Sequence, residues 1–329
     1  MLRSAIIGCG RIAGGYDEQS PPGVVLSHAK AYREHPETEL VAVCDVDVAR
    51  AEAFATRWGA RDFYADARTL LKEIKPDIVS ICTPDSTHGA ILRACLDAKP
   101  KAVWCEKPLT TDESEGRFLV EEFDRQGIPL AVNYSRRWDR GVQWLGEELR
   151  SAAHTARGVV FYGKGLRHNG SHAIDLLLQW FGSVSDVRVL GSRNDYAADD
   201  PTISAQIQFE SGAEVQLIAW DESLFTIWEI DLLTAKGRYR LLEAGQMLEQ
   251  YVLRNDPRFP GYVELDPVPE RRNTDLHRLA LLALENIVGA VLHNAALLSS
   301  GCTALNVLRV CNNIIQQAER SQKEAPCLN

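Results

Sequence analysis

Two stretches of the sequence carry side chains that could transfer protons. The segment Val103–Pro108 is a short apolar run that ends in an acid, a base and a proline. Ligands of open α/β sheets bind beyond the carboxyl ends of the strands, so Lys107 is expected to lie where a substrate would bind. The second stretch, residues 167–175, contains His168 and His172. Lysine and histidine side chains in a cleft can serve as general acids or bases.

The same two histidines could instead bind a metal ion. Their spacing allows this, but zinc sites need three or four protein ligands, no third ligand is evident nearby, and Gly170 disfavours a regular helix between them. We therefore expect no metal.

The eight cysteines show no paired short spacing of the kind found in zinc sites or redox dithiols. They stand at positions 9, 44, 82, 95, 105, 302, 311 and 327. Free thiols are typical of a reducing compartment, so we expect a cytoplasmic location.

The first glycine-rich turn has the spacing Gly8-x-Gly10-x-x-Ala13 and follows the apolar residues 4–7. Glycines at these positions let the backbone approach a pyrophosphate, which helix N-terminal amides can bind. A second apolar run, residues 40–44, ends in Asp45. A carboxylate there accepts hydrogen bonds from ribose hydroxyls and would repel a 2′-phosphate, so NAD is expected rather than NADP. The polar segment 14–23 lengthens the distance between this turn and Asp45. It should form a loop, which is either a lid or an ordinary surface loop.

A third apolar run, residues 77–82, precedes Thr83, Pro84 and a helix that would carry His88 in its first turn. The carboxyl ends of parallel strands meet at one edge of a sheet, so these runs should open onto one crevice. His88 could border the cofactor there or be an ordinary helix residue. The residues expected to contact the cofactor are Gly8, Gly10, Arg11, Ile12, Asp45, Thr83, Pro84, His88, Glu106 and Lys107.

The length of 329 residues suggests two domains, and 45% hydrophobic with 25% charged residues is typical of globular proteins. A net charge of −9 argues against general nucleic-acid binding. No run approaches the roughly 18 apolar residues of a membrane span. Over residues 185–242, strand-like segments follow one another without helices, which indicates a mostly antiparallel sheet. We expect an α/β Rossmann domain over residues 1–135, and an α+β domain with a large, mostly antiparallel open sheet over residues 136–329.

Together these motifs resemble the glucose-fructose oxidoreductase and inositol dehydrogenase family, Gfo/Idh/MocA. The resemblance rests on Gly8–Ala13, Cys82–Pro84 with His88, Cys105–Pro108 and Asn133–Arg137, and it continues into the second half. It implies a cis peptide bond before Pro108, and a homodimer or homotetramer formed through the outer face of the second sheet.

The resemblance also implies that Lys107 and His172 bind and deprotonate the reacting hydroxyl. The family pattern around His172 begins with an aspartate, whose position is taken here by His168, while Gly170, His172 and Asp175 match it. The catalytic residues expected are therefore Lys107 and His172, with His168 as a third candidate.

These features predict hydride transfer between NAD and a hydroxyl or ketone of a sugar or cyclitol. Basic residues near the expected strand ends favour a phospho-, nucleotide or carboxy sugar, because arginine forks suit such anions. The expected substrate contacts are Lys107, Arg137, Lys164, Arg167, His168, Asn169, His172 and Asp175. The alternatives are an NAD-using glycosidase with no net redox change and a non-catalytic sensor that binds the dinucleotide.

Overall fold

The chain divides into two compact units in the computed structural model, which describes residues 1–324. The first unit joins Met1–Trp138 with His277–Asn306, and the second joins Asp139–Leu276 with the residues from Val307 onward. The division after Trp138 lies close to the predicted boundary at residue 135. The prediction of one continuous second domain over residues 136–329 differs from this division, because residues 277–306 pack with the first unit.

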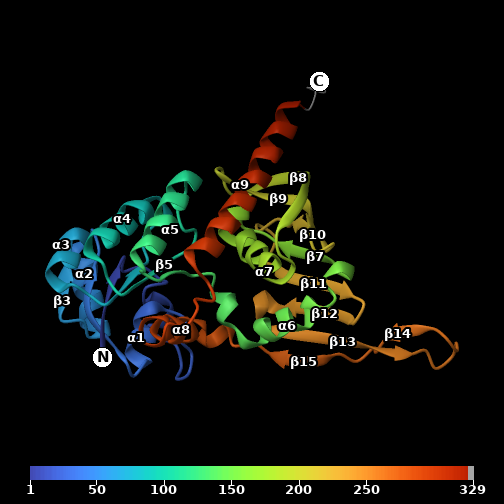
Figure 1. The fold of residues 1–329 in the computed structure, drawn as a ribbon, viewed down its shortest axis with the longest axis horizontal. Coiled ribbons are helices and arrows are strands. Elements are labelled where there is room, and N and C mark those ends of the chain that lie inside the picture. The colour runs from blue at the N-terminus through green and yellow to red at the C-terminus, as the bar shows by residue number, and fades with distance from the viewer. Residues whose placement is uncertain (325–329) are drawn as a thin grey trace. The chain divides into compact units, whose positions relative to one another are not determined.

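The first unit, whose residues 1–138 run from blue to green in Figure 1, is built on a six-stranded parallel sheet with the strand order β3-β2-β1-β4-β5-β6. The order reverses between β1 and β4, which makes this the switch point where open α/β sheets bind ligands. The strands are β1 Leu2–Ile7, β2 Thr38–Cys44, β3 Asp62–Tyr64, β4 Ile78–Ile81, β5 Ala102–Cys105 and β6 Leu130–Val132. Every residue of β4, β5 and β6 is buried, as expected for parallel strands with helices on both faces.

Helices connect these strands, and aspartate side chains begin several of them. Asp47, Asp66 and Asp112 each accept a hydrogen bond from a backbone amide of the first turn, which satisfies one of the amides that a helix start leaves unpaired. The helices are α1 His28–Glu34, α2 Val48–Trp58, α3 Ala67–Ile74, α4 His88–Ala98, α5 Glu113–Gln126 and α8 Leu279–His293, with short 3-10 turns at Gly15–Asp17, Asp85–Thr87, Ser135–Trp138 and Leu276–Arg278.

Residues 277–306 complete the first unit through backbone hydrogen bonds. Val25 N donates to His277 O at 2.7 Å, and Val132 N donates to Ser299 O at 3.0 Å, so the late segment covers the free edge of β6. Helix α8 packs against α1. Residues 276–293 are apolar and long enough to cross a membrane by composition alone, but a buried core helix of this kind meets the same criterion.

The second unit contains a nine-stranded sheet with the order β14-β13-β12-β11-β7-β10-β9-β8, and β15 pairs with β13. Among the described strands of this second sheet, only β7 and β10 pair in parallel, and the other pairs are antiparallel. The strands are β7 Arg157–Tyr162, β8 Val184–Ala197, β9 Asp200–Phe209, β10 Glu214–Ala219, β11 Trp228–Thr234, β12 Gly237–Leu242, β13 Met247–Asn255, β14 Val263–Leu265 and β15 Glu270–Asn273. The fold class predicted from the sequence is therefore confirmed.

Helices α6 Arg140–Arg150 and α7 Ser171–Phe181 belong to the second unit, and α9 Gly301–Glu324 begins in the first unit and ends in the second. A π-turn, Leu166–Gly170, leads directly into α7, and 3-10 turns occupy Ala153–Thr155 and Glu243–Gly245. The sequence analysis did not anticipate β13, β14 and β15. Strand β15 is polar and exposed throughout, and β13 and β14 combine polar residues with exposed apolar ones such as Val252 and Val263.

Candidate active site

The loops that follow β1 and β4 lie against each other at the switch point of the first sheet. Gly8 has φ +96°, and a Cβ there would come within 2.7 Å of the Cys82 carbonyl group and of Thr83 N. Only glycine allows both this backbone conformation and this approach. At Gly10 a Cβ would meet nothing within 4 Å, so this peptide faces open space where a pyrophosphate could approach.

Asp45, after β2, is held beside this loop by the backbone. One carboxylate oxygen accepts from Cys9 N at 2.9 Å and the other accepts from Asp47 N at 3.0 Å. Arg50 Nη1 lies 3.5 Å from Asp45 Oδ1, and its side chain is 56% exposed while that of Asp45 is 8% exposed. A fixed carboxylate at this place suits ribose hydroxyls, and the adjacent guanidinium is the one group here that would tolerate a phosphate.

The segment 14–23, predicted as a loop, is tied to the start of α1. Asp17 Oδ2 accepts from Leu26 N, Ser27 N and Ser27 Oγ at 2.7–2.8 Å. Lys30 Nζ donates to Ser20 Oγ at 2.6 Å. These contacts describe an anchored surface loop rather than a freely hinged lid.

Glu106 and Lys107 follow β5, and the peptide bond between Lys107 and Pro108 is cis, as the resemblance implied. Glu106 Oε1 accepts from Asn133 Nδ2 at 2.6 Å and contacts His28 Nε2 at 3.0 Å, while Oε2 accepts from Lys107 N at 3.3 Å. Burial opposes ionisation of Glu106, but the His28 and Asn133 contacts and the Lys107 charge outweigh it, so its pKa lies below the usual value. The end of β5 thus carries an ionised, oriented carboxylate.

His28 was not anticipated from the sequence. It begins α1, far from residue 106 in the chain, and its ring is fully buried against Trp104 with ring centres 3.6 Å apart. No local signal in the sequence shows that a side chain of α1 reaches the end of β5.

His88 is the first residue of α4, as predicted. Its side chain is buried, with Nδ1 2.7 Å from Pro108 O and Nε2 3.0 Å from Thr83 O. Both ring nitrogens therefore lie beside backbone carbonyls. His88 ties the loop after β4 to the loop after β5, and its contact with the cofactor stays a prediction.

In the second unit, the π-turn before His172 is held by Asp200, the first residue of β9. Its two carboxylate oxygens accept from Arg167 N at 2.7 Å and from His168 N at 2.8 Å. A Cβ at Gly165, where φ is +78°, would come within 2.2 Å of Asp200 Oδ2. Asp200 therefore positions the loop that carries the predicted catalytic histidines, although the sequence analysis did not single it out.

The polar side chains of this loop contact the protein around them. Arg167 donates to Asp199 O and to Asn312 Oδ1, both at 3.2 Å. Lys164 Nζ lies 3.7 Å from Glu222 Oε1, and Asn169 Nδ2 donates to Gly163 O at 3.0 Å.

The His168 ring packs on Tyr196, with ring centres 4.9 Å apart. Asp175, four residues into α7 from its start, is buried. In the first unit, Arg137 is also buried and donates to Leu298 O at 3.3 Å.

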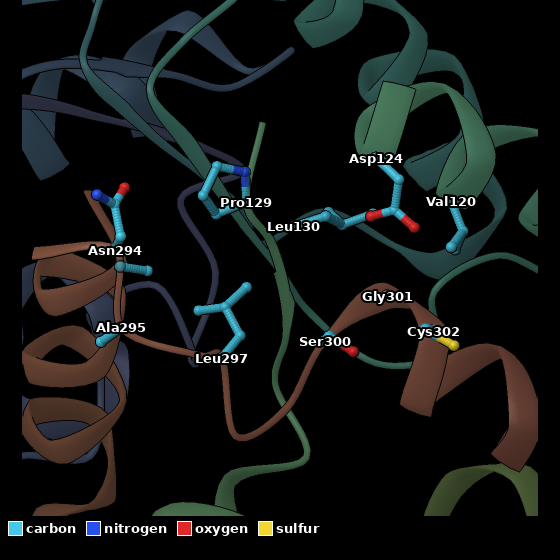
Figure 2. A pocket seen from close by; sticks show the side chains of 11 residues that line it. Val120, Asp124, Pro129, Leu130, Asn294, Ala295, Leu297, Ser300, Gly301 and Cys302 are labelled. Carbon is cyan, nitrogen blue, oxygen red and sulfur yellow. The ribbon is translucent and has the colours of Figure 1, made fainter. Parts of the chain in front are cut away.

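One pocket of the first unit lies away from all of these loops. Figure 2 shows it beside Pro129 and Leu130, at the start of β6, with Val120 and Asp124 of α5 and Cys302 of α9 around it. Its volume is about 330 Å³. None of the predicted site residues lines it, because those residues follow the opposite ends of the strands. Within residues 1–324, no group of three or more His, Cys, Asp or Glu side chains is arranged to hold a metal ion.

Known proteins have sequences similar to that of this chain. A protein-family model described as an oxidoreductase family with an NAD-binding Rossmann fold matches residues 2–134. The D-apiose dehydrogenase of Paraburkholderia graminis is 27% identical over 234 residues, which are 64% of this chain and 58% of that protein. The myo-inositol 2-dehydrogenase of Thermotoga maritima is 29% identical over 150 residues, which are 46% of this chain and 41% of that protein. The chain thus spans about half the length of these curated relatives.

A solved structure with the same architecture is an oxidoreductase from Agrobacterium radiobacter in complex with NAD+, L-tartaric acid and magnesium. It has a TM-score of 0.76 and 18% sequence identity, and the comparison covers 97% of both chains. At this identity the likeness establishes the fold. The family match makes the first unit an NAD-binding Rossmann domain, which confirms the cofactor predicted from Gly8, Gly10 and Asp45.

The Asp45–Arg50 pair generates a prediction about the choice of cofactor. We expect the wild-type protein to bind NAD+ more tightly than NADP+, because a 2′-phosphate would meet the acceptor-only carboxylate of Asp45. Asp45→Ser should raise NADP+ affinity, and Asp45→Ser with Arg50→Ala should lose that gain. Binding is measured by isothermal titration calorimetry. Equal affinities of the wild-type protein for the two cofactors would contradict the prediction.

Asp200 generates a prediction about stability. Asp200→Ala leaves two partly buried backbone amides without their charged acceptor, so we expect the free energy of unfolding to fall by about 1.5–3 kcal/mol. Hydrogen exchange at residues 166–172 should become faster. Urea unfolding and exchange mass spectrometry measure these two effects. The matched control is Asp199→Ala, which keeps the backbone carbonyl that Arg167 binds and should change neither quantity; an equal loss in both variants would contradict a specific role for Asp200.

Proposed function

We propose that this protein transfers a hydride between NAD and a hydroxyl or ketone of a sugar or cyclitol. The reason is that the chain belongs to the Gfo/Idh/MocA family of NAD-binding oxidoreductases. The observation that carries the proposal is the end of β5. There an ionised glutamate, a lysine and a cis-proline follow a buried strand of the part of the chain that matches the NAD-binding family. D-Apiose and myo-inositol, the substrates named for the relatives, are both polyhydroxylated and uncharged.

The residues of this chain divide the work between binding and proton transfer. Bound NAD supplies the hydride acceptor or donor. The loop from Gly8 to Ala13 would bind its pyrophosphate through backbone amides, and Asp45 its adenosine ribose. We propose that Lys107 and His172 bind the reacting hydroxyl and remove its proton, so that the C–H bond can release a hydride. His168 is a third candidate for the base.

The charge of the substrate is a separate question. The sequence analysis favoured an anionic sugar, but the basic side chains on which it relied already contact protein acceptors. Arg137 binds Leu298 O, Arg167 binds Asp199 O and Asn312, and Lys164 lies beside Glu222. These contacts support a neutral sugar or cyclitol more than a sugar that carries a phosphate or a carboxylate.

A spectrophotometric screen tests both proposals. Neutral sugars and cyclitols, sugar phosphates, sugar acids and nucleotide sugars are each incubated with the protein and NAD+, and absorbance at the NADH band is followed. We expect turnover with a neutral polyol. Faster turnover of an anionic derivative would contradict the proposal on charge. Product formation without net NADH would indicate the redox-neutral glycosidase, and NAD binding without any turnover would favour the sensor.

We also propose that the protein is a homodimer or homotetramer formed through the outer face of the second sheet. Asp231, Arg240, Glu249 and Arg271 stand opposite one another on β11, β12, β13 and β15, and form a row of alternating charges across that face. Two residues along β11 from Asp231, Leu233 is 51% exposed.

The free thiols of the described cysteines support a cytoplasmic location.

The oligomer proposal predicts a solution mass of two or four times 36.6 kDa in light scattering coupled to size exclusion. Leu233→Glu should lower that mass, because it places a charge in the interface. Phe118→Glu, at an exposed position of α5, is the control and should leave the mass unchanged. A wild-type mass of one chain would contradict the proposal.

The proposed catalytic pair predicts a pattern of turnover in variants. Lys107→Met and His172→Ala should each lower kcat by roughly 100-fold or more, the scale of losing general acid–base help. Because groups that act as one unit are not additive, the double variant should be little worse than the worse single one. Circular dichroism and NAD+ affinity should stay close to wild type.

His168→Ala decides whether this histidine shares the role of base. A loss comparable to that in His172→Ala would assign it part of the proton transfer, and a small loss would leave the role with Lys107 and His172. Near-normal turnover in Lys107→Met would contradict the assignment of the whole site.

A further inference from the structure

His28 reaches the carboxylate at the end of β5 from the start of α1. Its Nε2 lies 3.0 Å from Glu106 Oε1, and its Nδ1 lies 2.9 Å from Ser80 Oγ of β4. The ring is fully buried and stacked on Trp104 of β5. One side chain thus connects three elements of the first unit, and its two nitrogens have different partners.

The partners fix the direction of the hydrogen bonds. An ionised Glu106 can only accept, so His28 Nε2 must carry a hydrogen and donate it. Tyr32 OH lies 2.7 Å from Ser80 Oγ, and burial raises the pKa of Tyr32 far enough to keep its hydroxyl protonated. When every hydrogen is given an acceptor, Tyr32 OH donates to Ser80 Oγ, the Ser80 hydroxyl donates to His28 Nδ1, and His28 Nε2 donates to Glu106. This chain of hydrogen bonds ends on the Glu106 carboxylate.

The other groups around Glu106 either also favour its ionised form or are uncharged. Asn133 Nδ2 donates to the same oxygen as His28, and the Lys107 charge also lowers the pKa of Glu106. The thiols of Cys82 and Cys105 lie close, and burial raises their pKa well above the ordinary value, so both stay neutral. Glu106 is therefore a fixed anion just beyond the carboxyl end of β5, with 13% of its side chain exposed.

A pure packing role explains this arrangement poorly. Burying a carboxylate and an imidazole in the core removes both from water, and such pairs rarely stabilise a fold more than apolar side chains of the same size would. A fixed anion does have a use beside a nicotinamide ring, because the ring is positively charged when oxidised and neutral when reduced. A nearby carboxylate attracts the first form only.

We propose that His28 is a positioning residue that holds Glu106 ionised and oriented, and that Glu106 thereby makes the site favour NAD+ over NADH. The inference rests on the proposed function only in that NAD binds at this strand-end crevice. His28 itself acts through Glu106 and makes no contact with the cofactor in this account.

The first experiment tests the coupling in the protein without cofactor. The Glu106 carboxyl is titrated by ¹³C NMR with labelled glutamate, and its signal is assigned through Glu106→Gln. His28→Leu removes the donor while burial remains, so the titration of Glu106 should move to higher pH; His28→Gln supplies an amide donor and should restore most of the wild-type behaviour. His35→Gln, a change of another buried histidine just after α1, is the matched control and should leave the titration unchanged. An unchanged titration in His28→Leu would overturn the role of His28.

The second experiment measures Kd for NAD+ and for NADH by calorimetry at fixed pH. Glu106→Gln should shift the ratio of the two Kd values toward NADH by roughly tenfold or more, because one unit charge near the ring is lost. His28→Leu should shift it in the same direction, and His28→Gln should shift it less. In the wild-type protein the preference for NAD+ should disappear as pH falls through the lowered pKa of Glu106, because the carboxylate is then protonated.

The two experiments separate this inference from the proposed function. If Glu106→Gln leaves the ratio of Kd values unchanged, the selection of NAD+ by Glu106 is wrong, whatever the substrate screen finds. If no substrate is turned over but the ratio shifts, the dehydrogenase proposal fails and the inference stands. If His28→Leu does not fold, His28→Ala, which also lacks a donor, takes its place in both experiments.

Discussion

A buried carboxylate at the end of a parallel strand requires donors, and the first unit is arranged around supplying them to Glu106. Removing a carboxylate from water without donors costs several kcal/mol, and each hydrogen bond to a charged group returns about 1.5–3 kcal/mol. Here the donors come from α1, from the residue after β6 and from the backbone of Lys107. The relative placement of α1, β5 and β6 is therefore coupled to the ionisation of one side chain. A helix start that sits far away in the sequence becomes part of the chemistry at the strand end.

In the second unit, carboxylates also accept several hydrogen bonds, but there they hold a loop in place. Asp200 accepts two backbone amides of the π-turn, and Asp195 accepts from the Lys164 and Glu222 amides and from Thr202 Oγ1. Carboxylates on the β8–β9 hairpin thus replace regular secondary structure in holding the loop before α7. Glycine at position 165 is required because the carboxylate of Asp200 fills the space that a side chain would take. In both units an acid with several donors sets the backbone that precedes a candidate catalytic residue.

The sequence predicted the features that depend on local pattern, and it missed those that depend on distant contacts. Buried parallel strands are continuous apolar runs, so β1, β2, β4 and β5 and the loops after them were found from residue type alone. The resemblance added the cis bond at Pro108. His28 and Asp200 were missed because their partners lie 78 and 32–33 residues away. The assignment of residues 277–306 to the first unit was missed for the same reason, since the pairing of Ser299 with Val132 spans most of the chain.

The basic residues show that an arginine near a strand end can have protein acceptors of its own, so its charge alone does not identify a ligand. Arg137 and Arg167 were expected to bind an anion, yet each guanidinium donates to backbone carbonyls. An arginine offers five donors in a rigid fork, and carbonyls at the ends of loops are acceptors that need such donors when water is excluded. Here the two arginines hold loops in place through backbone carbonyls, as the aspartates do through backbone amides. Recognition of a substrate would then fall to the few groups that the loops present, and a lysine beside a fixed glutamate suits the removal of a proton from a hydroxyl.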